Sequence, residues 1–318
     1  MPAETVQPTP LIFWVAFHVG VLAVLAVDLF VFHRKARPVT LKEASTWTAV
    51  WVTLSLIFNG WVWHWKGPDR GVEFLTGYII EYSLSMDNIL VFVVVMSYFR
   101  VPAEYQHRVL FWGVIGAFIL RGIMIGLGVA IVHTFHWVLY LFGAFLVYTG
   151  FKLLFHQEEE VELEKNLVLR LCRKLMPVTP DYVGERFVAP HEGRTMFTPL
   201  ALVLVVLNFI DLVFAVDSIP AIFAVTTDPF IVYTSNICAV LGLRSLYFLL
   251  ASVIHRFVYL KPGLSVVLTL IGVKMLIADL WKMPTWMSLT AVVAILTISI
   301  GASLVVKPKP SAKDGKKS

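Results

Sequence analysis

The sequence predicts an all-α, polytopic membrane protein with about nine transmembrane helices. Composition, the number of long apolar segments and the placement of basic residues each support this fold class. Of the 318 residues, 58% are hydrophobic and only 15% are charged, and the mean hydropathy is +0.79. Soluble domains carry about 25% charged residues. A soluble chain of this length could not bury so much apolar surface, so the composition excludes that class.

Nine segments are long and apolar enough to cross a bilayer, which takes about 20 mostly apolar residues. In chain order they are residues 9–32, 43–63, 73–98, 109–132, 136–155, 198–225, 230–254, 258–281 and 285–306. Thr and Ser dilute the second segment, and only three residues separate the eighth from the ninth. We expect one transmembrane domain over residues 1–306.

Two segments lie outside the spans. The loop 156–197 begins with an acidic run and continues with the basic amphipathic stretch LVLRLCRKLM, residues 167–176. This stretch predicts a short helix on the inner membrane surface, and a solvated linker is the alternative. Residues 307–318 are rich in Lys, Pro, Gly and Ser, which predicts a disordered cytoplasmic tail.

The basic residues predict the orientation of the chain. Twenty of the 26 Lys and Arg residues lie in alternate loops and in the C-terminal tail. The other loops hold only Lys66, Arg70 and Lys282. Because Lys and Arg concentrate in cytoplasmic loops, we expect an odd number of spans, with the N-terminus outside and the C-terminus in the cytoplasm. The net charge of +5 then reflects topology and predicts no nucleic-acid partner.

Seven charged side chains remain deep within the predicted spans. A charge near the bilayer centre costs about 2.5–3.5 kcal/mol even on the mildest scale. Carboxylates retained there usually face the interior of the bundle and mark a path for ions or protons. The seven are Glu81, Asp87, Arg121, Asp211, Asp217, Arg244 and Lys274.

The intramembrane charges recur in the same order, which indicates an internal repeat. Glu81 and Asp87 are six residues apart, as are Asp211 and Asp217, and the two pairs are offset by 130 residues. The next span of each set carries an arginine, and the span after that carries GFKLL or GVKML. We expect repeat one at about 73–155 and repeat two at about 198–281. Their opposite directions predict an inverted repeat, a feature of many secondary transporters.

The spacing of the acids limits how they can share one cation. Six residues of α-helix rise about 9 Å and turn through about 600°, so the two acids of one pair do not share a face. Either the helices break near the acids, for example at Pro220, or one acid from each repeat meets at the pseudo-twofold axis. Asp87 and Asp217 are then the natural pair, with Glu81 and Asp211 as outer or alternating ligands.

Carboxylate and amide oxygens suit hard divalent cations such as Mg²⁺, Ca²⁺ and Mn²⁺. Met86 beside Asp87 would favour Mn²⁺, although a methionine in an apolar span more often serves packing. The expected ligands are Glu81, Asp87, Asn88, Asn208, Asp211 and Asp217. The expected charge-pairing or gating residues are Arg121, Arg244 and Lys274, and acids that only balance buried arginines are the alternative. No permanently bound cofactor is expected.

Four stretches resemble the TerC family of membrane proteins, specifically its Alx-like bacterial branch. They are EYSLSMDNILVF (81–92), NFIDLVFAVDSIPAIFAVT (208–226), SNICAVLGLRSLYF (235–248) and the loop NLVLRLCRKLMPVTPDYVGERF (166–187). The resemblance extends from about residue 10 to 300. It implies a LysE-type transporter that exports manganese(II) from the cytoplasm across the bacterial inner membrane, and the older label of tellurium resistance also attaches to the family.

Other readings remain open. The exported cation could be calcium or another divalent ion, and a scaffold that assists protein insertion or a stress response is a further alternative. An intramembrane aspartyl enzyme would also need two acids on two helices, but it would leave the basic residues of the repeats unexplained and needs a Gly-x-Gly-Asp motif that the chain lacks. We therefore expect a transporter and no enzyme. Membrane lipid and the cation are the expected partners, and the oligomeric state is open.

Overall fold

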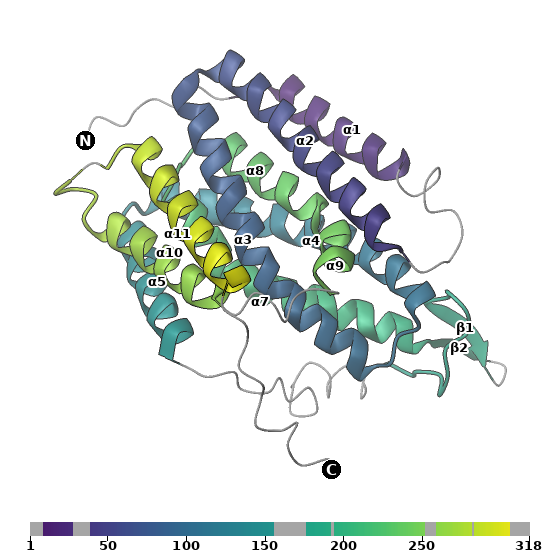
Figure 1. Ribbon diagram of the computed structural model, residues 1–318. Helices are drawn as coiled ribbons and strands as arrows, with labels where there is room; N and C mark the ends of the chain where they lie inside the picture. Colours follow the sequence, from purple (N-terminus) through teal and green to yellow (C-terminus); the bar gives the residue numbers. More distant parts are fainter. Residues whose placement is uncertain are drawn as a thin grey trace, which may run out of the picture.

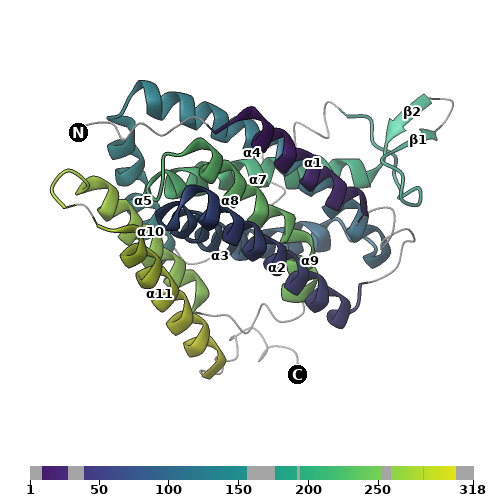
Figure 2. The same cartoon turned by 90° about the horizontal axis from the view of Figure 1, so that it is seen from above.

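The computed structural model describes residues 9–27, 39–155, 176–191, 194–251, 259–281 and 283–305. Over these ranges the chain forms ten α-helices and one β-hairpin (Figures 1 and 2). They are α1 (Leu11–Val27), α2 (Leu41–Lys66), α3 (Pro68–Tyr98), α4 (Ala103–Thr134), α5 (Val138–Phe155), β1 (Val188–His191), β2 (Arg194–Phe197), α7 (Pro199–Phe223), α8 (Pro229–Leu241), α9 (Leu243–Ala251), α10 (Leu260–Leu276) and α11 (Thr285–Val305).

Every predicted span contains a helix, and the seventh contains two. Five helices are long and apolar enough to cross a membrane by themselves, namely α3, α4, α5, α7 and α11. The pair α8 and α9 passes the same test together but is bent by 42° at a break, where Gly242 separates the two helices. An all-helical multi-pass protein is therefore confirmed, whereas the count of nine spans stays a prediction. Helices α1 and α10 have 17 residues each, and α2 is more polar.

Helix starts follow the local sequence. Proline occupies the first turn of α3, α7 and α8, where its missing N–H has no intrahelical partner to lose. The N-cap of α8 is Asp228, whose Oδ1 accepts hydrogen bonds from the backbone N–H groups of Phe230 (2.9 Å) and Ile231 (3.3 Å). Thr40 caps α2 in the same way, accepting from the Glu43 N–H at 3.3 Å. These caps position the helix ends around the charged residues described below.

Helices α5 and α10 pack antiparallel through small residues. A Cβ atom on Gly272 would lie 2.7 Å from the carbonyl oxygen of Gly143, which is closer than real Cβ contacts. Farther along the pair, the Ser265 hydroxyl donates to the carbonyl oxygen of Gly150 at 2.5 Å. The numbering thus rises along one helix as it falls along the other. In Figures 1 and 2, α11 lies beside this pair.

Two more antiparallel contacts join a helix of the first predicted repeat to its counterpart in the second. In α3 and α7, Gly77 lies against Ile222, whereas Phe92 and Leu207 line the same small cavity at the other end. Helix α4 runs against α8 and α9 in the same manner. Each helix of residues 68–155 therefore packs against its expected counterpart in residues 199–276, with the direction reversed.

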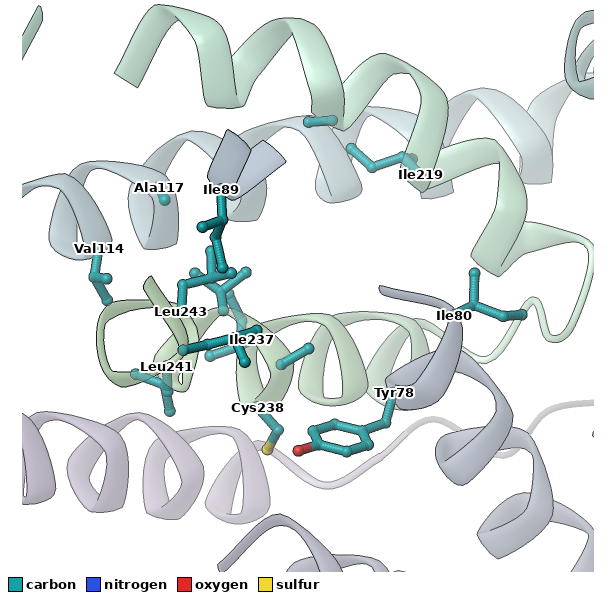
Figure 3. Packing of buried hydrophobic residues seen from close by; sticks show 14 of the residues in the cluster. Tyr78, Ile80, Ile89, Val114, Ala117, Ile219, Ile237, Cys238, Leu241 and Leu243 are labelled. Atoms are coloured by element: carbon teal, nitrogen blue, oxygen red, sulfur yellow. The ribbon is translucent and has the colours of Figure 1, made fainter. Parts of the chain in front are cut away.

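Apolar side chains fill the interior and also cover the outside. In Figure 3, Ile89 of α3 points toward the same region as Leu243 and Ile237, and Cys238 lies near the Tyr78 hydroxyl. On α4, an exposed apolar stripe recurs every four residues at Ile119, Ile123, Leu127 and Ile131. An apolar stripe facing outward from a helix bundle is expected where lipid replaces water.

The loop before α7 contains the hairpin, which the sequence analysis did not predict. Strands β1 and β2 pair antiparallel, with Val188 opposite Phe197 and His191 opposite Arg194. The Tyr182 hydroxyl donates to the Phe99 carbonyl oxygen at 2.8 Å, so this loop is attached to the corner between α3 and α4. The predicted surface helix at 167–176 lies almost wholly outside the described residues, and the tail 307–318 lies entirely outside them.

Candidate intramembrane ion site

A buried arginine joins one acid from each predicted repeat at the centre of the bundle. The Arg121 guanidinium on α4 donates to Asp211 on α7 through Nη2–Oδ1 (2.8 Å) and Nε–Oδ2 (3.1 Å). Its Nη1 also donates to Glu81 Oε1 on α3. Arg121 is 1% exposed, and Glu81 and Asp211 are each 2% exposed. Two carboxylates that are 130 residues apart in the chain thus share a single guanidinium.

Asn236 on α8 completes this centre. Its Nδ2 donates to Glu81 Oε2 at 2.8 Å, and its Oδ1 accepts from Arg121 Nη1 at 3.2 Å. Ser85 donates to Glu81 from one turn along α3, at 3.3 Å. Four helices therefore meet at one polar cluster, which we call the central cluster: Glu81, Ser85, Arg121, Asp211 and Asn236. Asn236 was not among the predicted site residues, although a lone amide within an apolar span was a usable signal.

The formal charge of the central cluster is negative. With both acids ionised, two carboxylates face one guanidinium and leave one negative charge uncompensated within the cluster. A buried ion pair repays its desolvation only when the geometry is good and the remaining polar atoms are hydrogen-bonded. Asn236 and Ser85 supply such bonds to Glu81. The surplus charge favours a cation or a proton at this depth.

Small residues allow the helices to approach closely enough to form the central cluster. Gly116 on α4 leaves room for the Asn208 side chain of α7, and a Cβ at that position would overlap the amide. At the far side of Arg121, a Cβ on Gly128 would lie 2.7 Å from the Phe223 ring. The two glycines therefore set the distance between α4 and α7, and with it the contact between Arg121 and Asp211.

The second acid of each pair lies away from Arg121. Asp217 on α7 is half-buried and accepts a hydrogen bond from Thr149 Oγ1 on α5 at 3.5 Å, with Lys152 near enough to act on its charge. Asp87 on α3 is also half-buried. Since α3 and α7 are antiparallel, Asp87 is displaced from Glu81 toward the end of α3 at Tyr98. Asp217 is displaced from Asp211 in the opposite direction along the bundle.

The two predicted asparagine ligands have different surroundings. Asn88 is buried beside Asp87. Asn208 donates through Nδ2 to the Leu204 carbonyl oxygen at 2.8 Å, whereas its Oδ1 is buried with no hydrogen-bond partner. A buried carbonyl oxygen without a donor is energetically unfavourable. Asn208 lies one helical turn from Asp211. Its Oδ1 can therefore bind a cation or accept a hydrogen bond, and the central cluster supplies neither partner.

The remaining two predicted residues lie outside the central cluster. Arg244, at the start of α9, is 6% exposed and stacks over the Phe111 ring at 5.9 Å. Arg244 and Asp211 line one small cavity of about 20 Å³, enough to hold one water molecule. Lys274 on α10 lies near Glu73 of α3, and their charges interact. Glu73 was not among the predicted site residues.

Neither helix with paired acids breaks beside them. Helix α7 continues through Pro220 to Phe223, and α3 runs uninterrupted from Pro68 to Tyr98, so the first of the two expected arrangements is not seen. In place of the second, one acid from each repeat does meet, but the pair is Glu81 and Asp211 and not the expected Asp87 and Asp217. Within the described ranges, no group of three or more His, Cys, Asp or Glu side chains is close enough to hold a metal ion. In this conformation Arg121 occupies the position between the carboxylates of Glu81 and Asp211.

Comparisons with known proteins agree with this architecture. The family model for integral membrane proteins of the TerC family matches residues 66–311. The chain is 53% identical over 293 residues to an uncharacterized membrane protein of Myxococcus xanthus, covering 92% of each chain. It is 47% identical over 300 residues to the membrane-bound redox modulator Alx of Escherichia coli K12, covering 92% of this chain and 93% of that protein. No solved structure shows significant similarity to the chain.

Proposed function

Since the chain belongs to the TerC family of integral membrane proteins, we propose that it is a secondary transporter that exports manganese(II) from the cytoplasm. The observation that carries the proposal is the central cluster, where two acids from opposite halves of the chain share Arg121. Burying these charges among apolar helices is costly. A transport site accounts for that cost, because the cluster supplies the charge that a cation needs inside the membrane.

The formal charges of the intramembrane residues match one divalent cation. Four carboxylates, Glu81, Asp87, Asp211 and Asp217, carry four negative charges when ionised. Arg121 and Arg244 carry two positive charges. The sum is two negative charges, which one Mn²⁺ neutralises. Lys274 lies near Glu73, which also forms an ion pair with Arg70, and this group is not counted in the sum. Neutrality lets the loaded site face either side of the membrane with the least electrostatic penalty.

The proposed mechanism is alternating access, in which the cation replaces the Arg121 guanidinium between the carboxylates of Glu81 and Asp211. In the resting arrangement Arg121 holds Glu81 and Asp211 together. Entry of the cation from the cytoplasm displaces the guanidinium, and Asn208 Oδ1 and Asn88 then supply further oxygen atoms in this proposal. The antiparallel packing of each helix with its counterpart supports an inverted repeat, in which the two halves rock about a central site.

Export of a divalent cation needs an energy source. The inside-negative potential opposes its exit by about 4.6 kcal/mol per 100 mV, since each elementary charge contributes about 2.3 kcal/mol. We propose that protons entering from outside protonate the carboxylates after release and reset the site. The chain then acts as a cation/proton antiporter in the bacterial inner membrane, with the N-terminus outside and the C-terminus in the cytoplasm.

Purified protein in liposomes tests the transport function directly. We expect the wild-type protein to move Mn²⁺ across the bilayer, measured with a fluorescent indicator trapped inside. Asp87→Asn and Asp217→Asn should each reduce the rate at least about tenfold, because each removes a charged ligand. Asp69→Asn is the matched control, since Asp69 is exposed in the first turn of α3.

The outcomes separate the alternatives. Full activity of both Asp87→Asn and Asp217→Asn would show that the assigned site is wrong. Transport of Ca²⁺ in preference to Mn²⁺ would retain the site and change the substrate. A wild-type protein that moves neither cation, under an imposed pH gradient as well as without one, would favour a scaffold role in the membrane.

A further inference from the structure

A second group of charged residues lies where the corner between α2 and α3 meets the loop from α7 to α8. Lys66 Nζ contacts Asp228 Oδ2 at 2.6 Å, and these side chains are 12% and 2% exposed. The ammonium also lies over the Phe230 ring, 5.6 Å from its centroid. This ion pair joins the end of α2, just before the first predicted repeat, to the start of α8 in the second repeat.

Beside it lies an ion pair that also reaches the α7–α8 loop. Arg70 Nη1 donates to both carboxylate oxygens of Glu73, at 2.7 and 3.0 Å, and contacts Thr226 Oγ1 at 3.4 Å. Thr226 Oγ1 in turn accepts from the backbone N–H of Asp228 at 3.2 Å. Lys66, Arg70, Glu73, Thr226 and Asp228 thus form one connected group, which we call the corner cluster.

The corner cluster and the central cluster lie on the same two helices. Helices α3 and α8 run parallel, since Lys66 beside α3 meets Asp228 and Glu81 farther along meets Asn236. On each helix eight residues separate the two clusters, from Glu73 to Glu81 and from Asp228 to Asn236. Eight residues of α-helix rise about 12 Å. Separation of α3 and α8 at the corner would therefore also strain the hydrogen bond that Asn236 donates to Glu81 farther along the same two helices.

The opposite end of the bundle is held differently. There the Arg108–Glu185 ion pair has a similar length, 2.7 Å, but its side chains are 42% and 32% exposed. The small cavity beside Asp211 and Arg244 also lies toward that end, since Phe92 and Leu207 line it. The charged centre is therefore covered on one side by ion pairs that are less exposed than Arg108–Glu185, and it adjoins a cavity on the other side.

We propose that the corner cluster is the outer gate of the transport pathway and that the gate is closed in this conformation. The inference rests on the proposed transport function and on the orientation predicted from the basic residues, which places Lys66 and Arg70 outside. Release of the cation requires Asp228 to separate from Lys66 and Thr226 from Arg70. The gate also explains why Lys66 and Arg70, two of the few basic residues predicted on the outer side, lie in partly buried ion pairs.

Thiol labelling tests the gate without relying on transport. Ser235 is fully buried on α8 between the two clusters, beside Gly77. We would introduce Ser235→Cys into a chain carrying Cys172→Ser and Cys238→Ala and label it from outside, in spheroplasts, with a membrane-impermeant maleimide. Asp228→Asn and Lys66→Met should each raise the labelling rate at least about tenfold, since each breaks a buried ion pair.

The variants are chosen to preserve the fold. Asparagine is as good an N-cap as aspartate, so Asp228→Asn retains the start of α8 and removes only the charge. Methionine retains the apolar stem of Lys66. The matched control is Arg108→Gln, which breaks the exposed ion pair at the other end and should leave labelling unchanged. Monodisperse elution in detergent checks that each variant is folded.

Each outcome decides one of the two proposals. Unchanged labelling in both Asp228→Asn and Lys66→Met, or an equal rise in Arg108→Gln, would overturn the gate. Faster labelling in these two variants, in a protein whose wild type moves no Mn²⁺ in liposomes, would support the gate and reject manganese transport. In an active protein, we expect the open-gate variants to leak Mn²⁺ without an opposite flow of protons, whereas Mn²⁺ movement by the wild type should be accompanied by that flow.

Discussion

At the scale of single residues, Arg121 determines how the buried acids are arranged. Its guanidinium has five N–H donors in a fixed plane, and the geometry lets it bind Asp211 through two of them while a third reaches Glu81. A lysine could not bridge both carboxylates in this way, because its ammonium is a compact point charge. The arginine is therefore the structural link between α3, α4 and α7 and, in the proposed mechanism, the group that the transported cation displaces.

Removal of this guanidinium should destabilise the protein strongly. Arg121→Gln leaves two buried carboxylates without their partner, which costs about 3–5 kcal/mol, and the loss should appear as a lower melting temperature in detergent. The exposed ion pair Arg108–Glu185 provides the comparison, because surface pairs contribute about 0–1 kcal/mol. A melting temperature in Arg121→Gln no lower than in Arg108→Gln would contradict the central role of Arg121.

At the scale of helices, the apolar segments were predictable and the breaks were not. The segments 73–98 and 198–225 became α3 and α7 within a few residues, because long apolar stretches have few alternatives to a helix in a membrane. A break near Pro220 was one of two arrangements that the sequence left open, yet α7 continues past this residue, and the break occurs at Gly242. Glycine also occurs within continuous helices, as Gly126 does in α4, so Gly242 by itself carried no signal of the bend.

The close contact between α5 and α10 gives a prediction at this scale. Gly272→Ala would place a methyl group 2.7 Å from the Gly143 carbonyl oxygen and 2.8 Å from the Val147 backbone nitrogen. Because backbone atoms cannot rotate away, we expect the helices to separate and stability to fall by about 1–3 kcal/mol. Thermal unfolding in detergent measures this loss.

Gly126→Ala is the control for that experiment. Gly126 lies inside α4, and no atom would lie within 4 Å of the added Cβ. Alanine should therefore gain about 0.5–1 kcal/mol from its better helix propensity. Equal effects of the two substitutions, in either direction, would show that packing at Gly272 does not limit the approach of α5 and α10.

At the scale of the whole molecule, the distribution of charge separates the surface into zones. Apolar side chains cover the outside of α1, α4 and α11, whereas charged residues gather in the central cluster, in the corner cluster and at the loop ends. Such a surface is unstable in water and stable in a bilayer. The same distribution predicts the orientation, because Lys and Arg concentrate in cytoplasmic loops.

The orientation can be tested independently of transport. A reporter that is active only outside the inner membrane, fused after residue 318, should be inactive, and a reporter that fluoresces only in the cytoplasm should be bright. Fusions in the segment between α2 and α3, near Gly67, should give the reverse pattern. The opposite result at both positions would overturn the predicted orientation and would place the corner cluster on the cytoplasmic side.

The sequence by itself determined that the chain lies in a membrane, which charges are intramembrane and where the two sets of acids recur. These properties depend on composition and spacing along the chain, which folding does not alter. Only the tertiary structure decided which acids meet. Glu81 and Asp211 lie 40 and 90 residues from Arg121, and Asp87 and Asp217 have the same chemistry and similar positions in their helices. The choice between these acids depends on helix rotation and on the approach allowed by Gly116 and Gly128, and those arise from packing over the whole bundle.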